Sequence, residues 1–302
     1  MSAKPDSLKT IFFALGANFA IFAAKLVVAL WTGSSALLAE AVHSLADCGN
    51  QGLLLVGIQS AKKPSSADYP LGHGKAIYFW SFLVALILFS MGGLFSIYEG
   101  VEKLHDPQPI RRAWMAIGVL AFSIAAESVS MWGCLREVNK VRENDSLWRW
   151  FRTSRQSELL VVFGEDLAAL LGLVFALAAV SLTVATGNPI FDALGTLVIG
   201  VLLVVIAFFI AVEVKALLIG QSVDERTRRA MGEFLAARDE VDRVLNLLTL
   251  QLGGDVMLAV KAKMRQTGGT AELVADINRV EAALRARFPQ VRWSFFEPDL
   301  ED

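Results

Sequence analysis

Long apolar segments dominate the first 220 residues of the chain, and short polar segments separate them. A helix needs about 20 consecutive apolar residues to cross the hydrocarbon core of a bilayer. Six segments reach that length, at about residues 8–31, 36–61, 76–104, 113–138, 158–185 and 190–219. The pattern predicts an all-α bundle of six transmembrane helices.

Turn-forming residues separate these predicted spans. The turn at residues 32–35 and the Gly187-Asn188-Pro189 turn are so short that each must join antiparallel neighbours. The longer loop at residues 62–75 contains two prolines and a Gly72-His73-Gly74 triplet, which end regular structure. A charged stretch, residues 136–155, precedes the fifth span.

The pattern changes near residue 220, where shorter periodic segments replace the long apolar ones. Helical spacing is followed by two alternating segments around Gly253-Gly254-Asp255, a plausible hairpin turn. The expected elements are helix 224–237, strands 244–252 and 256–264, helix 273–288 and strand 292–296. We therefore predict two domains: a transport domain, residues 1–219, and a small cytoplasmic α+β domain of ferredoxin-like αββαβ order, residues 220–302.

Composition supports a membrane protein and excludes some other classes. Hydrophobic residues make up 55% of the chain and charged residues 19%, whereas soluble domains usually have about a quarter charged. The net charge of −2, without a basic stripe among aromatics, predicts no nucleic-acid partner. Cys48 and Cys134 both fall inside apolar segments, where we expect buried thiols and no disulfide.

The basic residues predict the orientation of the bundle, because cytoplasmic loops carry an excess of Lys and Arg. Three flank the spans on one side, namely Lys103, Arg111 and Arg112. Eleven flank them on the other: Lys4, Lys9, Lys62, Lys63, Lys75, Arg136, Lys140, Arg142, Arg149, Arg152 and Arg155. Both termini are therefore expected in the cytoplasm. The short polar N-terminus is typical of a signal anchor, so a bacterial inner membrane is the first expectation and an organellar membrane the alternative.

Ionisable residues lie inside several predicted spans, where they are costly and usually functional. His43 and Asp47 in the second span are four residues apart, so they share one helix face. An imidazole nitrogen and a carboxylate oxygen form half of a tetrahedral site for a divalent metal. Glu127 in the fourth span and Glu165 and Asp166 in the fifth would repel each other and Asp47 without a cation or bound protons.

Other polar residues in the spans have simpler interpretations. A His–Asp pair can also be a structural hydrogen bond between helices. Asn18, Lys25, Asn50 and Gln51 are interpreted as packing or hydrogen-bonding groups. His105, beyond the third span, is expected to be a solvated surface group.

Two segments of the sequence resemble motifs of a known protein family. Residues 35–47, SALLAEAVHSLAD, resemble the second-helix signature of the cation diffusion facilitators, the zinc-transporter type of secondary carrier. Residues 69–75, YPLGHGK, resemble that family's His-Pro-x-Gly-His-Gly-Arg/Lys loop. The resemblance implies a homodimer in the lipid bilayer that exchanges a divalent metal, most often Zn²⁺, for protons.

The resemblance also implies a transport site built from two residues of helix two and two of helix five. His43, Asp47 and Asp166 match three of these ligands. The fourth position falls on Val162, which cannot ligate, so Glu165 or Glu127 is expected to replace it. A variant branch of the family with Glu-Asp in the fifth helix is similar.

A second, weaker metal site is possible in the loop. Tyr69 stands where the family has its first loop histidine, which leaves His73 with Asp68 nearby. The C-terminal segment has no His or Cys, so we expect it mainly to dimerise.

The expected mechanism is alternating access around a site near the membrane midplane. Metal and protons compete for the same ligands, and His43 is the natural titrating member. The ligand set favours Zn²⁺, with Mn²⁺, Fe²⁺ and Co²⁺ as alternatives, and no prosthetic group is expected. An intramembrane metalloenzyme is the first rival, but its His-Glu-x-x-His signature is missing, so no enzyme is predicted. A non-transporting metal sensor or scaffold is the second rival. The intact His43–Asp47 pair argues against it, and the Val162 departure keeps it open.

Overall fold

The computed structural model describes residues 7–32, 35–107, 113–142, 144–265 and 268–301, without the side chains at 7–9, 29, 31–32, 35–43 and 46. The chain forms two compact units. The first, the helical unit, contains residues 1–58, 79–152 and 157–214. The second, the C-terminal unit, contains residues 59–78, 153–156 and 215–302.

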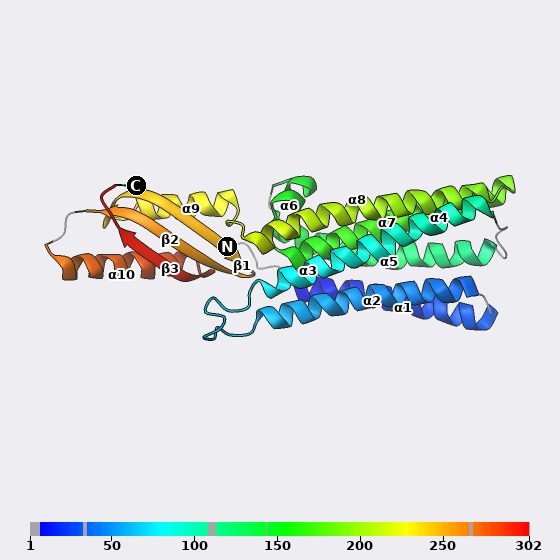
Figure 1. Ribbon diagram of the computed structural model, residues 1–302, viewed down its shortest axis with the longest axis horizontal. Coiled ribbons are helices and arrows are strands. Elements are labelled where there is room, and N and C mark those ends of the chain that lie inside the picture. The colour runs from blue at the N-terminus through cyan, green and yellow to red at the C-terminus, as the bar shows by residue number, and fades with distance from the viewer. Residues whose placement is uncertain (1–6, 33–34, 108–112, 143, 266–267, 302) are drawn as a thin grey trace. The chain divides into compact units, whose positions relative to one another are not determined.

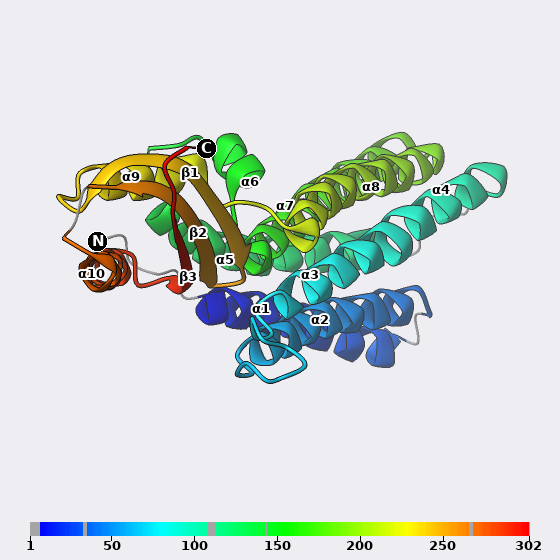
Figure 2. The same ribbon diagram turned by 60° about the vertical axis from the view of Figure 1, so that its left-hand side comes forward.

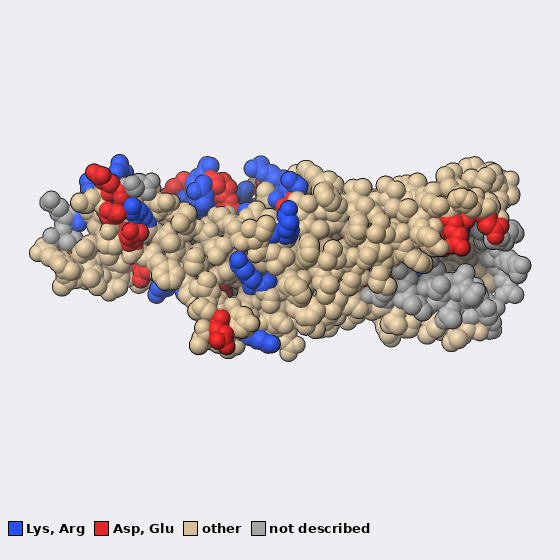
Figure 3. Space-filling view, viewed as in Figure 1, with Lys and Arg blue, Asp and Glu red and all other residues tan. Residues whose placement is uncertain are grey.

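The helical unit is built from long apolar helices that run alongside one another (Figure 1). These helices are α1 (Ser7–Thr32), α2 (Ser35–Ala61), α5 (Ala113–Val141), α7 (Ser157–Thr186), α8 (Ile190–Ile219) and the continuous run α3 (Ala76–Ile87), η1 (Leu88–Leu94) and α4 (Phe95–His105). On the face shown in Figure 3, Lys, Arg, Asp and Glu side chains are few over these helices.

Five helical segments of the described chain are long and apolar enough to cross a membrane: Thr10–Val28, Ala76–His105, Ala113–Val141, Ser157–Thr186 and Ile190–Ile219. The chain is therefore a multi-pass membrane protein. Helix α2 coincides with the predicted second span but is not among the five. The side chains at 35–43 and 46 of α2 lie outside the described residues, and the six-span count stays a prediction.

The third span contains a feature that periodicity did not predict, a π-helical segment, η1. Within it, the Ser90 hydroxyl donates a hydrogen bond to the Leu86 carbonyl at 2.7 Å. Nearby glycines allow close approach to α8: a Cβ at Gly100 would lie 2.7 Å from the Leu197 side chain, and one at Gly200 would lie 2.7 Å from the backbone nitrogen of Ile97. Small residues at a helix contact bring the two backbones together in this way.

A short helix, α6 (Leu147–Thr153), lies in the charged stretch before α7, where no helix was predicted. Packing stabilises it, since the Trp150 ring meets the Phe163 ring edge-on with centroids 5.5 Å apart. Arg152 forms an ion pair with Glu213 of α8 at 2.9 Å. The buried side chains of α6, Trp150 and Phe151, thus pack against the neighbouring helices.

The C-terminal unit has the predicted αββαβ order. It contains α9 (Glu225–Ala236), β1 (Val241–Leu252), β2 (Asp255–Met264), α10 (Thr270–Arg287) and β3 (Val291–Pro298). Strand β2 is central, antiparallel to β1 and parallel to β3. Both helices pack on one face of the sheet (Figure 2), around a core that includes Met231, Leu235, Leu258, Val260, Val280 and Leu284.

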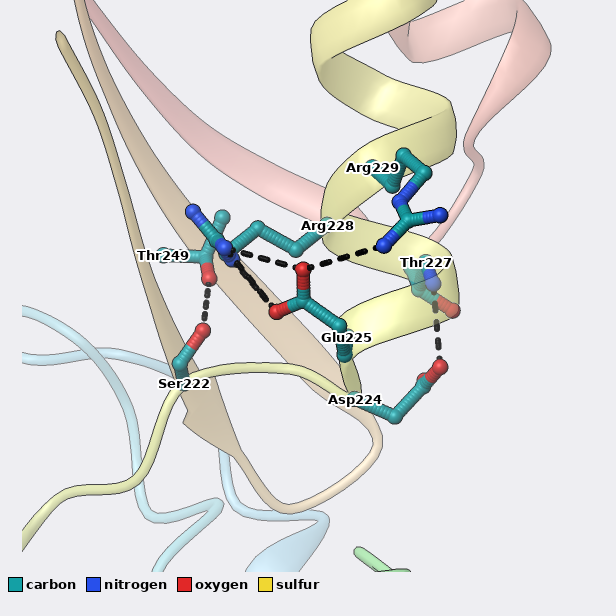
Figure 4. A network of polar contacts seen from close by, with 7 residues as sticks. All are labelled: Ser222, Asp224, Glu225, Thr227, Arg228, Arg229 and Thr249. Atoms are coloured by element: carbon teal, nitrogen blue, oxygen red, sulfur yellow. Dashed lines mark hydrogen bonds and ion pairs between the residues drawn. The ribbon is translucent and has the colours of Figure 1, made fainter.

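Helix α9 begins with a side-chain cap. The Asp224 carboxylate accepts a hydrogen bond from the Thr227 amide at 2.9 Å, which satisfies one of the free amides of the first turn. Glu225 lies between Arg228 and Arg229 and forms ion pairs with both (Figure 4). These contacts fix the start of the helix directly after the chain leaves α8.

The loop before α3 packs on the β1–β2 hairpin within the C-terminal unit. The Gly253 amide donates a hydrogen bond to the hydroxyl of Tyr78, a fully buried side chain, at 2.8 Å. Gly253 has a positive φ of 66°, as the tight turn requires. Gly74 and Leu252 meet backbone to backbone, so a Cβ at Gly74 would overlap the Leu252 carbonyl.

Gly74→Ala is expected to separate this loop from the hairpin, because the new methyl group has no space against the Leu252 backbone. Overpacking of this kind costs about 1–3 kcal/mol. We expect a lower thermal unfolding temperature and faster amide exchange over residues 72–78. Gly254→Ala is the control, because Gly254 lies in the β1–β2 turn but faces open space. Equal behaviour of the two variants would contradict the contact between Gly74 and Leu252.

Candidate metal site

The helical unit buries a group of polar and charged side chains in its interior. Helix α1 packs against α5 and α7, and α5 packs against α7. Together with α2 these helices bury Asn18, Lys25, Ser44, Asn50, Gln51, Ser123, Glu127, Ser130, Glu165 and Asp166. Burying polar groups is unfavourable unless they find hydrogen-bond or ionic partners. The partners of each carboxylate therefore define the site.

Glu165 of α7 reaches across to α2. Its side chain is 6% exposed. The Asn50 amide nitrogen donates to its Oε1 at 2.9 Å, and the Gln51 amide nitrogen donates to its Oε2 at 2.6 Å. Both carboxylate oxygens thus face the helix that carries Asp47.

Asp166, the next residue, faces α5. It is 2% exposed, and its Oδ2 accepts a hydrogen bond from the Ser130 hydroxyl at 2.9 Å. Glu127 lies three residues before Ser130 on α5 and is 3% exposed. The charges of Glu127 and Asp166 act on each other, so the two carboxylates share one region of the interior.

Asp47 of α2 belongs to the same region. Its side chain is partly buried, and its charge acts on both Glu127 and Glu165. His43 lies one helical turn before it, but the His43 side chain is outside the described residues. The part played by that imidazole stays a prediction.

The structure brings the predicted acidic residues close enough for their charges to interact, but their described side chains do not surround a common point. Among the described side chains, no group of three or more His, Cys, Asp and Glu is arranged to hold a metal ion. Val162, one turn before Asp166, is fully buried and offers no ligand. His43, whose side chain lies outside the described residues, stays a further predicted donor.

The sequence predicted the role of the two amides but missed one hydroxyl. Asn50 and Gln51 were predicted as packing or hydrogen-bonding groups, and both donate hydrogen bonds to the candidate ligand Glu165. Ser130 was not predicted at all, although its position three residues after Glu127 places it on the same helix face. That spacing was the available signal.

The predicted metal site in the loop has few candidate ligands among the described residues. The His73 ring lies against the Tyr69 ring, with centroids 4.3 Å apart. His73 Nδ1 is buried and has no hydrogen-bond partner in the described part of the chain, while Asp68 is exposed. His105 is exposed, as expected, and lies in the last turn of α4.

Comparison with known proteins adds a family-level match. The family model for the cation efflux transmembrane domain matches residues 11–219. The chain is 34% identical over 235 residues to the mitochondrial proton-coupled zinc antiporter SLC30A9 of Homo sapiens, which covers 76% of this chain and 41% of that protein. The corresponding antiporter of Xenopus laevis is 32% identical over 247 residues, covering 81% of this chain and 44% of that protein.

A plant relative is similar to the same extent. Metal tolerance protein C4 of Arabidopsis thaliana is 32% identical over 254 residues, which cover 82% of this chain and 54% of that protein. The chain thus spans less than half the length of the zinc antiporters and about half the length of the plant protein.

Gln51→Leu is expected to destabilise the helical unit, because it removes a donor from the buried Glu165 carboxylate while keeping the side-chain volume. Interhelical hydrogen bonds in membranes contribute about 1–2 kcal/mol in model peptides. Thermal unfolding in detergent measures the loss. Gln59→Leu changes an exposed glutamine of the same helix and should have little effect; an equal shift for both variants would argue against the Glu165 contact.

Proposed function

The chain belongs to the cation diffusion facilitator family, and on that premise we propose that it is a secondary transporter for a divalent transition-metal cation. It exports the ion from the cytoplasm in exchange for protons. Zn²⁺ is the first proposed substrate, because similar proteins are named proton-coupled zinc antiporters. Mn²⁺, Fe²⁺ and Co²⁺ are the alternatives for a ligand set rich in carboxylates.

One observation carries the proposal: four carboxylates from three apolar helices interact with one another at membrane depth. They are Asp47, Glu127, Glu165 and Asp166. Such a concentration of negative charge is unfavourable in a low-dielectric interior unless a cation or protons neutralise it. A site that alternates between a divalent ion and protons satisfies that requirement in both states.

The proposed ligands are His43, Asp47 and Asp166, with either Glu165 or Glu127 as the fourth. A carboxylate has about four lone-pair sites. Glu165 can therefore keep its bonds to the two α2 amides and still offer an oxygen to the ion. Glu127 is the alternative because it approaches from α5, on the side where Ser130 holds Asp166.

The proposed cycle is alternating access around this site. Ligands must lose protons to bind metal, so a proton gradient displaces the ion on the acidic side of the membrane. The imidazole of His43 changes charge near neutral pH, which suits it to this exchange. No prosthetic group and no bond-making chemistry are needed, so no enzymatic activity is proposed.

The assembly and location belong to the same proposal. We assign six spans, both termini in the cytoplasm, and a homodimer whose C-terminal segment contributes the contact between copies. A bacterial inner membrane is the first location, and a mitochondrial membrane is the alternative, since the animal relatives are named as mitochondrial.

A metal sensor that does not transport is the competing function, and the replacement of a usual ligand by Val162 favours it. Binding and flux separate the two functions. A sensor binds the ion in detergent but moves none across a sealed vesicle, whereas a transporter does both.

Asp47→Ala is expected to lower proton-driven Zn²⁺ uptake into proteoliposomes at least about tenfold, because an ion ligand is lost from the barrier-determining site. A metal-sensitive dye inside the vesicles reports the flux. Asp106→Ala, an exposed acid outside the bundle interior, is the control and should keep wild-type flux. Normal uptake by the Asp47 variant would refute the site assignment.

Glu165→Gln and Glu127→Gln identify the fourth ligand. The variant that removes a ligand should weaken Zn²⁺ binding, measured by calorimetry, by about one to two orders of magnitude. The other should bind near normally. Equal binding by both variants and wild type would remove both residues from the ligand set.

A further inference from the structure

Lys25 is a charged side chain in an unusual place. It lies in the apolar segment Thr10–Val28 of α1 and is 6% exposed. Among the described residues it is the only lysine or arginine whose side chain is buried. A cation at membrane depth is expensive, and it is retained where it has a functional counter-charge.

The contacts of Lys25 lead to the carboxylate cluster. Its Nζ donates a hydrogen bond to the Ser44 hydroxyl at 3.1 Å. Ser44 directly follows His43 on α2 and lies one turn from Asp47. The positive charge of Lys25 also acts on Glu127 of α5. The ammonium group therefore lies against the segment of α2 that carries His43 and Asp47, within electrostatic range of Glu127.

The charge balance of a transport cycle shows what such a cation can do. A bound divalent ion offsets two of the four negative charges of Asp47, Glu127, Glu165 and Asp166. Once the ion has left, incoming protons neutralise part of the cluster, which then crosses its inward-to-outward transition without the metal. Any carboxylate that stays ionised in the low-dielectric interior opposes that step.

We infer that Lys25 is an internal counter-ion that, together with the incoming protons, neutralises the carboxylate cluster after the metal has left and allows the metal-free carrier to return. When the ion binds, its charge replaces that of the ammonium near the carboxylates. Lys25 acts here as a positioning residue, not as a ligand, because an ammonium group has no lone pair to offer. The inference rests on the proposed transport function and deepens it.

The inference separates two modes of transport. Net exchange of metal for protons requires the metal-free carrier to return in every cycle. Exchange of labelled for unlabelled metal requires only that the loaded carrier move in both directions. Loss of Lys25 should therefore slow the first mode and spare the second, whereas a purely structural side chain would affect both alike.

The test uses the full-length protein in proteoliposomes with Zn²⁺ as the probe. Lys25→Met keeps the length of the side chain and removes its charge. We expect proton-driven net Zn²⁺ uptake to fall at least about tenfold, a barrier change of about 1.4 kcal/mol. Exchange of external radiolabelled Zn²⁺ for unlabelled Zn²⁺ inside should stay within about twofold of wild type, well below that tenfold effect.

Two further variants keep the result interpretable. Lys25→Arg retains the charge and should recover part of the net exchange. Lys103→Met is the matched control, since Lys103 forms an ion pair between α4 and α8 with Asp192 at 3.2 Å, away from the carboxylates. If Lys103→Met lowers transport, it should lower net exchange and metal–metal exchange by the same factor.

The possible outcomes are distinct. A parallel loss of both modes in Lys25→Met, or unchanged net exchange, overturns the role of Lys25. If Lys25→Met is poorly folded, Lys25→Gln and Lys25→Arg decide the question by the same ratio of the two modes. Absence of any flux in the wild-type protein would instead contradict the proposed function.

Discussion

The organisation of the helical unit depends on one constraint: carboxylates that leave water must find donors within the protein. Glu165 meets that constraint through the amides of Asn50 and Gln51, and Asp166 meets it through the hydroxyl of Ser130. These bonds join α7 to α2 on one side and to α5 on the other. These buried carboxylates and their donors therefore also help to determine which helices lie together.

Under the proposed function, this arrangement would reconcile the stability of the bundle with the exchange of its ion. Fully satisfied carboxylates would hold the helices in one state, and unsatisfied ones would prevent the bundle from assembling. Neutral amide and hydroxyl donors offer an intermediate solution, because they satisfy the carboxylates without adding a fixed positive charge. Under the proposed function, the interior would fold stably and still accept an ion or protons.

Much of the architecture could be predicted from the sequence because the patterns that indicate it extend over many residues. The apolar segments extend over many turns, and alternation in the C-terminal strands is regular, so the αββαβ order was confirmed. The π segment η1 and helix α6 were not predicted, since both depend on packing that local pattern does not report. Spacing identified Asp47 as a ligand candidate, and the family resemblance identified Asp166. Neither could reveal that Glu165 bonds to Asn50 and Gln51, because those partners are more than a hundred positions apart.

The joining of the loop before α3 to the β1–β2 hairpin has a practical consequence for how the protein is divided. Because Tyr78 accepts the hydrogen bond of the Gly253 amide, a fragment cut out at residue 220 would lose its natural cover over the hairpin. Such a fragment would leave the Gly253 amide without the Tyr78 hydroxyl that accepts its hydrogen bond in the intact chain. Studies of the isolated sheet would then describe a surface created by the excision, and grafting residues 59–78 back would be the way to restore it.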